Sequence, residues 1–236
     1  MLLQVILLTI GAYLLGSVPT AYIAGKLIRG IDVRKHGSGS VSGSNVWASV
    51  ARWAVVPVGI ADILKGLIPV FIAHLADFSV GAQGIVGLAA IAGHNWSIFL
   101  RFTGGRGIAT TMGVLILMAR WELLVFVVVW LLCLALLRNS PLGALLGGVS
   151  LPFASLGFGE PLALTLCLMG MVLLMMTKRL IANWSFDALA GEWKQVALYR
   201  ILLDRDVRAR EAWIHRKPPN VERALGEEED VKESRE

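Results

Sequence analysis

Apolar and polar segments alternate along most of this chain. Seven apolar segments stand out, at 2–25, 53–75, 81–100, 108–119, 122–137, 141–158 and 161–177. An α-helix needs ~20 residues to cross the hydrocarbon core of a bilayer, within a range of ~17–25. The first three segments are long enough, whereas 108–119 and 122–137 are short and would also fit one helix over 108–137. The pattern predicts an all-α fold, a polytopic membrane helix bundle.

Basic residues decide between six and seven helices, because Lys and Arg concentrate in cytoplasmic loops. The loop 26–52 is rich in Lys and Arg, whereas the turn around Asp77 has neither. A break near Arg120 places Arg138 and the charged C-terminal segment inside, while a fused helix places that segment outside. We therefore expect seven transmembrane helices with the N-terminus outside and the C-terminus inside. The shortest of them would be partial spans that lean on their neighbours.

Composition supports a membrane protein with a charged tail. Hydrophobic residues make up 56% of the chain, and the mean hydropathy is +0.68. We expect a membrane domain over 1–182, a helical or amphipathic cytoplasmic tail over 183–221, and a disordered charged end over 222–236. Apolar residues recur at helical spacing in 184–203, which fits either the membrane surface or packing against the loops.

The net charge of +5 comes from the membrane part. Basic loops beside apolar spans report orientation or anionic partners, so nucleic acid is not expected as a partner. Cys133 and Cys167 both lie in apolar segments and offer no zinc-binding spacing, which favours a packing role and no metal site. The first charge is Lys26, so the N-terminal segment is typical of a retained span rather than a cleaved signal peptide.

The stretch 93–111, GHNWSIFLRFTGGRGIATT, interrupts the apolar pattern with glycines, hydroxyls and arginines. Glycines let backbone N–H groups approach a ligand closely. A helix that begins near Gly107 would aim its free N–H groups and positive dipole end at the same place. Arg101 and Arg106 add charge, which points to a phosphate or another anion. The alternative is a plain cytoplasmic turn whose arginines only mark orientation.

A second polar loop, 34–45, alternates glycines and serines before another apolar segment. Ser44 or Asn45 suits the N-cap of the following helix. The loop is either a flexible linker with a cap or a second set of N–H and hydroxyl donors. Because the orientation argument puts both loops on the cytoplasmic side, together they indicate a small anionic substrate beside the lipid bilayer.

Three ionisable residues lie near these loops. Asp62 and Lys65 are three positions apart in an apolar segment, so they face one side of a helix and can pair. Ionisable residues inside a span usually face a polar cavity or each other. The pair therefore either rigidifies the bundle or directs Lys65 into the polar site. His94 stands between a glycine loop and an apolar segment, and we favour a functional role over a structural one.

Four stretches carry a resemblance to a known family: GSVPTAYIAGK (16–26), KHGSGSVSGSN (35–45), DILKG (62–66) and GHNWSIFLRFTGGRGIAT (93–110). They resemble the integral-membrane glycerol-3-phosphate acyltransferase family, the PlsY type. The resemblance implies seven helices in a bacterial cell membrane with the active face cytoplasmic. It implies transfer of an acyl chain from acyl-phosphate to the 1-hydroxyl of glycerol 3-phosphate, giving lysophosphatidate, without a metal or nucleotide cofactor.

The resemblance also implies roles for individual residues. The expected catalytic residues orient the reacting hydroxyl and carbonyl and support the pocket: Ser38, Ser44, Asn45 and His94. The expected phosphate-binding residues are Lys65, Arg101, Gly104, Gly105, Arg106, Gly107 and Thr110. Arg106 stands where the family usually has a Lys, which keeps the charge and changes its geometry.

Other positions depart from the family pattern. Ala48 replaces the arginine of the first motif, and Arg52 lies one helical turn further on. Ala144 falls in an element that is serine-rich in the family, with Ser140 as the nearest hydroxyl. Asn183 and Glu192 are the remnants of the third motif. Together with Arg52, Asp62 and Ser140 they form a second group of candidate site residues.

Two rival interpretations remain open. The departures at Ala48 and Ala144 favour a divergent paralogue that binds a phosphorylated metabolite at the membrane without turnover. A small-solute transporter would place polar sites near the bilayer midplane. Apart from Asp62 and Lys65, the polar residues of this chain gather on one side instead.

Overall fold

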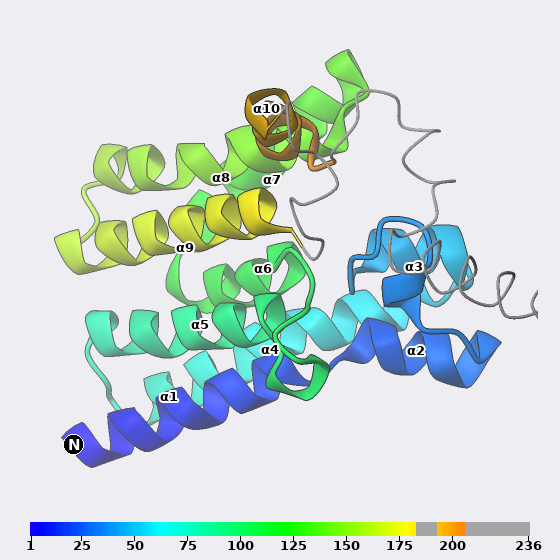
Figure 1. Cartoon of the computed structure of the whole chain (residues 1–236). Coiled ribbons are helices and arrows are strands. Elements are labelled where there is room, and N and C mark those ends of the chain that lie inside the picture. Colours follow the sequence, from blue (N-terminus) through cyan, green and yellow to red (C-terminus); the bar gives the residue numbers. More distant parts are fainter. Residues whose placement is uncertain (183–192, 206–236) are drawn as a thin grey trace, which may run out of the picture.

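The computed structural model describes residues 1–182 and 193–205, and the regular structure in these ranges is helical (Figure 1). The longer helices are α1 (Leu2–Ser17), α2 (Thr20–Arg29), α4 (Val55–Leu75), α5 (Val80–Asn95), α6 (Ile108–Met118), α7 (Arg120–Leu137), α8 (Ser140–Gly157), α9 (Leu162–Ile181) and α10 (Trp193–Leu203). The loops contain the short helix α3 (Gly43–Ser49) and the 3-10 turns η1 (Val33–Lys35) and η2 (Ile98–Leu100).

All seven predicted apolar segments form helices. Among the described residues, five helical stretches are long and apolar enough to cross a membrane: 2–29 (α1 with α2), α4, α7, α8 and α9. α6 and α5 are shorter, with 11 and 16 residues. α5 ends at Asn95 rather than near 100, because the chain turns back there and the amide of Gly105 donates to the carbonyl of His94.

Two breaks shape the bundle. The predicted break near Arg120 is confirmed, because Ala119 has a non-helical backbone (φ −153°, ψ 59°) that separates α6 from α7. A second break, which we did not predict, divides the first apolar segment between Ser17 and Thr20. Pro19 lies in it and has no N–H to continue a helical ladder. This break exposes the end of α1 to the polar site described below.

α5 and α6 pack closely against their neighbouring helices. α5 packs against α1, α4, α6 and α9, and α6 packs mainly against α4. A Cβ at Gly93 would meet the carbonyl oxygen of Tyr13 in α1, and one at Gly113 would meet that of Ile63 in α4. Small residues that allow such approach are typical of helix pairs in membranes.

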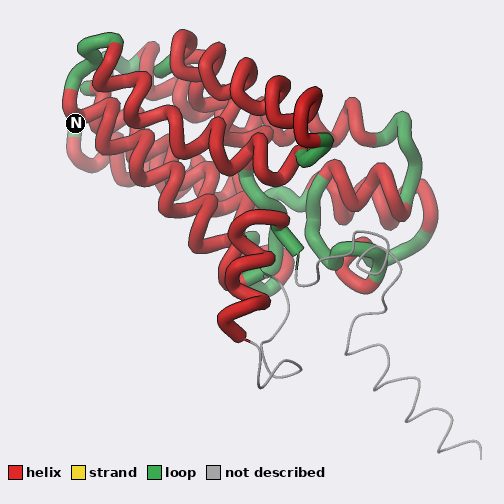
Figure 2. The backbone as a smooth tube through the Cα atoms, turned by 90° about the horizontal axis from the view of Figure 1, so that it is seen from above, coloured by secondary structure: helices red, strands yellow, loops and turns green. Residues whose placement is uncertain are grey.

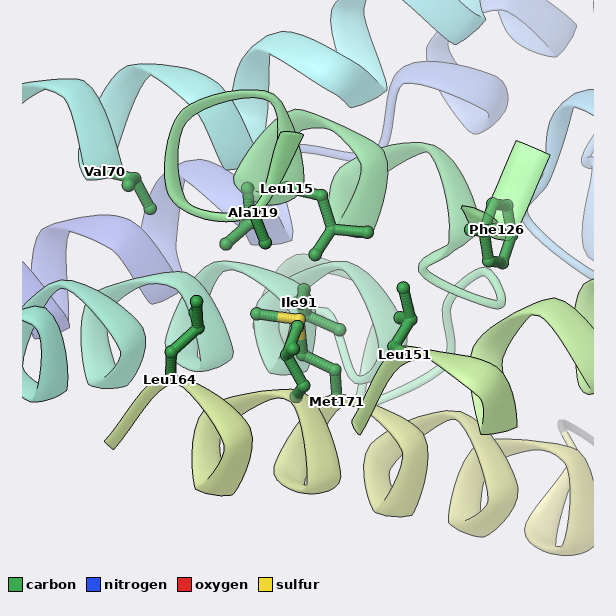
Figure 3. Packing of buried hydrophobic residues seen from close by; sticks show 10 residues of the cluster. Val70, Ile91, Leu115, Ala119, Phe126, Leu151, Leu164 and Met171 are labelled. Atoms are coloured by element: carbon green, nitrogen blue, oxygen red, sulfur yellow. The ribbon is translucent and has the colours of Figure 1, made fainter. Parts of the chain in front are cut away.

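The largest apolar core lies where α4 to α9 meet (Figure 3). Its members are buried and come from all six helices: Val70, Ile91, Leu115, Phe126, Leu151 and Met171 are examples. Other large apolar side chains point outward along the long helices, among them Leu7, Phe71, Leu131, Phe153 and Leu166. An apolar exterior of this extent suits a lipid surrounding.

α10 runs across the bundle rather than along it, beside the ends of α8 and α9 (Figures 1 and 2). Two buried arginines attach it through main-chain carbonyls. Arg179 of α9 donates to the carbonyl of Ile201 (2.7 Å) and to that of Pro141 (2.8 Å), while Arg200 of α10 donates to the carbonyl of Leu180 (2.8 Å). The described part of the predicted amphipathic segment therefore packs on the bundle.

Candidate functional site

The two glycine loops meet at one end of the bundle, in agreement with the prediction that both lie on the same side of the membrane. The amide of Val41 in the first loop donates to the carbonyl of Gly104 in the second (3.3 Å). A Cβ at Gly105 would lie 2.6 Å from the carbonyl oxygen of Val41 and would also meet Nε2 of His94. Glycine is therefore needed at 105 by close approach, and the two loops form one surface around His94.

Asn45 holds the first loop in shape. Its Nδ2 donates to the carbonyls of Val33 (2.8 Å), His36 (3.1 Å) and Ser40 (2.9 Å), and its Oδ1 accepts from the amide of Ser38 (3.3 Å). α3 begins at Gly43 with Ser42 as its N-cap, so the prediction that Ser44 or Asn45 is the N-cap is wrong. Asn45 was predicted to act on substrate, and its polar atoms are instead bonded within the loop.

The start of the same loop is braced by an ion pair. Arg34 donates to the carboxylate of Asp32, with Nη2 2.7 Å from Oδ2. Partial burial raises the pKa of Asp32, but the hydrogen bonds from Arg34 outweigh it, so the pKa of this carboxyl lies below its ordinary value. The charged form is thus the one that supports the loop.

A buried polar cluster lies beneath the loops, and it combines predicted residues with one that we did not predict. Lys65 Nζ donates to Asp62 Oδ1 (2.6 Å) and to Thr20 Oγ1 (2.9 Å), and Thr20 Oγ1 donates to Asp62 Oδ1 (2.6 Å). His94 Nδ1 lies 3.6 Å from the same Asp62 oxygen. The side chains of Asp62 and Lys65 are 4% and 5% exposed. The predicted pair thus exists and is directed at His94.

A small cavity adjoins this cluster. Its polar lining comes from the α1–α2 break, from Lys65 and from the second loop: Ser17, Thr20, Lys65, His94, Ser97 and Gly104. Ser17 Oγ is buried and finds no hydrogen-bond partner among the described residues. A buried cation, a histidine and an unused hydroxyl around one space fit a small polar or anionic group.

The N-terminus of α6 follows the second glycine loop, and Ile108 in its first turn lines the larger cavity described below. Gly107 is its N-cap, with a left-handed backbone (φ 72°) and no side-chain cap, which confirms the predicted helix start. Thr110 and Asn95 are fully buried here, and their side-chain polar atoms have no partner among the described residues. A Cβ at Gly107 would lie 2.6 Å from Oδ1 of Asn95. The helix end thus offers free N–H groups and unused polar atoms.

Arg106 points away from the small cavity. Its Nε lies 2.9 and 3.0 Å from the two carboxylate oxygens of Asp204, and its Nη1 donates to the carbonyl of Lys178 (3.3 Å). Lys178 is buried, with Nζ 5.4 Å from the ring centre of Trp96. Arg106 and Lys178 also interact electrostatically with each other, and Lys178 does so with His94. A basic patch therefore links the glycine loop to the end of α9.

Arg106 also stands at the edge of a larger, mostly apolar cavity. Its other walls come from α5 to α9: Ile91, Ile108, Thr111, Met112, Leu115, Phe126, Gly148, Leu151, Met171, Val172 and Met175. An apolar space with one guanidinium at its edge matches a ligand with an apolar chain and an anionic head.

The remaining predicted residues lie apart from this centre. Arg101 and Ser44 are exposed, and Ser44 Oγ is 3.1 Å from Ser42 Oγ. The exposed Arg52 sits over the ring of Trp47 (5.6 Å), and Ser140 accepts from Nε1 of Trp130 (3.0 Å). Asn183 and Glu192 lie outside the described residues.

Sequence reasoning missed Thr20, Asn95 and Lys178. The Ser17-Val18-Pro19-Thr20 stretch carried a signal, because a proline with hydroxyls inside an apolar segment often marks a functional break. Lys178 closes an apolar segment, where a basic residue also serves as an orientation marker, so its position carried no specific signal. Asn95 carried no signal of its own.

Comparison with known proteins gives a consistent result. Residues 6–184 match the family described as glycerol-3-phosphate acyltransferase. The chain is 36% identical over 222 residues to glycerol-3-phosphate acyltransferase 5 of Dehalococcoides mccartyi, covering 92% of this chain and 95% of that protein. It is 42% identical over 142 residues to the glycerol-3-phosphate acyltransferase of Trichlorobacter lovleyi, covering 60% and 73%.

Two solved structures are also similar, both of PlsY, an integral membrane glycerol 3-phosphate acyltransferase. The glycerol 3-phosphate form has a TM-score of 0.70 and 30% identity, and the lysophosphatidic acid form has 0.68 and 29%. Each alignment covers 75% of this chain and 88% of the PlsY chain.

Proposed function

Because this chain belongs to the glycerol-3-phosphate acyltransferase family, we propose that it transfers an acyl chain to the 1-hydroxyl of glycerol 3-phosphate. The product is lysophosphatidate, the first acylated intermediate of phospholipid synthesis. The observation that carries the proposal is the cluster of Lys65, Asp62, Thr20 and His94 directly beneath two glycine loops. It combines a buried cation with closely approaching backbone, which is what a phosphorylated substrate requires.

The acceptor site is assigned to the small cavity and the loops around it. The N–H groups at the start of α6 are assigned to the substrate phosphate or the developing oxyanion, and Gly104, Gly105 and Gly107 allow the close backbone approach around them. Lys65 supplies positive charge, and Asp62 keeps Lys65 and Thr20 in place. Ser38 lies on the loop that Asn45 fixes, so Asn45 acts as a positioning residue.

The donor is assigned to the larger cavity. Acyl-phosphate combines a long apolar chain with an anionic head, and the cavity combines apolar walls with Arg106 at its edge. Lys178 adds a second cation near Arg106. The glycerol 3-phosphate hydroxyl attacks the acyl carbonyl, the new ester C–O bond forms, and the bond from the acyl carbon to the phosphate oxygen breaks. The released phosphate carries the hydroxyl proton away.

We further propose the membrane arrangement expected from the charges. The ends that carry the two glycine loops, Arg138 and Lys178 face the cytoplasm of a bacterium, and the turns at Asp77 and Glu160 face outward. This gives seven spans, with α5 and α6 as short spans that lean on α1, α4 and α9. The lipid bilayer then surrounds the exposed apolar side chains of the long helices.

A second candidate function is binding of a phosphorylated metabolite without turnover. Ala48, where the family has an arginine, is exposed on α3, and Arg52 sits over Trp47 rather than at the polar cluster. The two functions differ in one measurable step, the formation of lysophosphatidate.

The decisive assay uses purified protein in detergent or nanodiscs with labelled glycerol 3-phosphate. Palmitoyl phosphate is expected to give labelled lysophosphatidate, and palmitoyl-CoA is not. Binding of glycerol 3-phosphate without product, in folded protein, would reject the acyltransferase function and support the second candidate. Product from palmitoyl-CoA alone would reject the acyl-phosphate donor. Arg106→Ala is expected to raise the KM for palmitoyl phosphate steeply. An unchanged KM would show that Arg106 does not belong to the donor site.

A further inference from the structure

The contact between Arg106 and Asp204 joins two parts of the chain 98 positions apart. Asp204 directly follows α10, and its carboxylate lies within 3.0 Å of the guanidinium that the glycine loop presents. Both side chains are largely buried, at 11% exposed for Arg106 and 19% for Asp204. The family match ends at residue 184, so α10 and Asp204 lie beyond it. An acid from outside the matched region thus contacts a charged residue of the proposed site.

The surroundings of Asp204 are basic. Arg179 interacts electrostatically with Asp204 and with Arg106, and Lys178 interacts with Arg106. Among the described residues, Arg106 and Arg179 therefore lie near this carboxylate, and Lys178 lies near Arg106. Such proximity of cations is unfavourable without an anion to offset it. Asp204 supplies that negative charge where a ligand phosphate would also bind.

We propose that Asp204 is an internal competitor for the phosphate of the substrate, and that binding of phosphate at Arg106 displaces it together with the end of α10. The inference rests on the proposed function for the nature of the ligand, a phosphate monoester or acyl-phosphate. A phosphate dianion offers three oxygens and more charge than a carboxylate, so it replaces the ion pair favourably. Because Asp204 follows the last residue of α10 and lies outside the apolar core, the exchange needs no unfolding of the core.

α10 remains attached while Asp204 moves. The hydrogen bonds from Arg179 to Ile201 and from Arg200 to Leu180 end on main-chain carbonyls and do not involve Asp204. They hold the helix on α8 and α9 while its last residues shift. The competitor therefore lowers the affinity of the resting protein for phosphate and leaves the bundle unchanged.

The test compares the wild type with Asp204→Asn, which keeps the shape and one acceptor oxygen but removes the charge. Calorimetry in nanodiscs measures the Kd of palmitoyl phosphate and, separately, of inorganic phosphate. We expect both Kd values to fall about tenfold. Asp77→Asn removes the same charge from the exposed turn between α4 and α5, at the far end of α5 from the glycine loop, and is expected to leave both values unchanged.

An unchanged Kd in Asp204→Asn overturns the proposal. A higher Kd also overturns it, because Asp204 would then position Arg106 instead of competing for it. Hydrogen exchange gives an independent readout: saturation with palmitoyl phosphate should speed exchange at the C-terminal end of α10, and unaltered exchange contradicts displacement. These experiments measure binding alone. Absent turnover therefore rejects the proposed function without touching the competitor, and an unaffected Kd rejects the competitor even in an active enzyme.

Discussion

The buried pair Asp62–Lys65 allows the stability and the function of the site to be tested separately. The two charged atoms are 2.6 Å apart, and both side chains are at most 5% exposed. At an effective dielectric constant of ~20 their attraction is roughly 6 kcal/mol, and each ion loses several kcal/mol of hydration on burial. The intact pair therefore adds little net stability, but a single partner left alone is costly. We expect Asp62→Asn and Lys65→Met each to lower the free energy of unfolding by about 3–5 kcal/mol.

The double variant Asp62→Asn/Lys65→Met should be more stable than the additive sum by at least about 2 kcal/mol, because no unpaired charge remains. The assay is unfolding by SDS in mixed micelles, with calorimetry of glycerol 3-phosphate binding on the same samples. Binding should be lost in all three variants, since Lys65 is absent or misplaced. The partly buried surface pair Asp32–Arg34 is the matched control, with an expected coupling below about 1 kcal/mol. Additive effects at 62 and 65, within about 0.5 kcal/mol, refute the reasoning.

Three further outcomes are expected. Gly105→Ala places a methyl against His94 and the Val41 carbonyl. The KM for glycerol 3-phosphate should therefore rise about tenfold or more, with a loss of stability of roughly 1–3 kcal/mol. The control Gly59→Ala adds a methyl in open space and should leave this KM unaltered. Asn45→Ala leaves carbonyls of the first loop without a donor and should lower the stability by roughly 2–3 kcal/mol. The loss should be visible as faster protease cleavage within 33–45. Equal cleavage rates would contradict the bracing role of Asn45. Because the folded-state pKa of Asp32 is depressed, the stability that it contributes is present above pH ~4 and is lost as pH falls through that lowered value. Asp32→Asn should therefore abolish this part of the acid dependence of loop protection, and an identical pH profile would exclude it.

The large-scale arrangement could be predicted because it follows from local pattern and charge. Apolar length located the seven helical segments, and the orientation rule separated α6 from α7 at Ala119, where hydropathy alone allowed one helix. The meeting of the two glycine loops followed from the same rule. The pairing of Asp62 with Lys65 followed from helical spacing and is confirmed at 2.6 Å.

The partners of individual side chains could not be predicted in the same way. Arg106 was expected to face the substrate, but its guanidinium contacts Asp204, a residue that no local pattern connects to it. Asn45 was expected at a helix cap or on a substrate, yet the fold of its own loop uses its amide. Thr20 reaches Asp62 only because the chain breaks at Pro19. Each case depends on a contact between distant segments, which spacing within one segment does not encode.

The two cavities draw on different portions of the chain. The polar one is lined only by residues between Gly16 and Gly104, whereas the apolar one takes much of its wall from α7, α8 and α9, with Gly148 and Met175 among the contributors. Substitutions in the second half of the chain can therefore lengthen or shorten the apolar space and leave the polar cluster as it is. Preference for chain length and recognition of the phosphorylated alcohol are free to diverge separately among descendants of this protein.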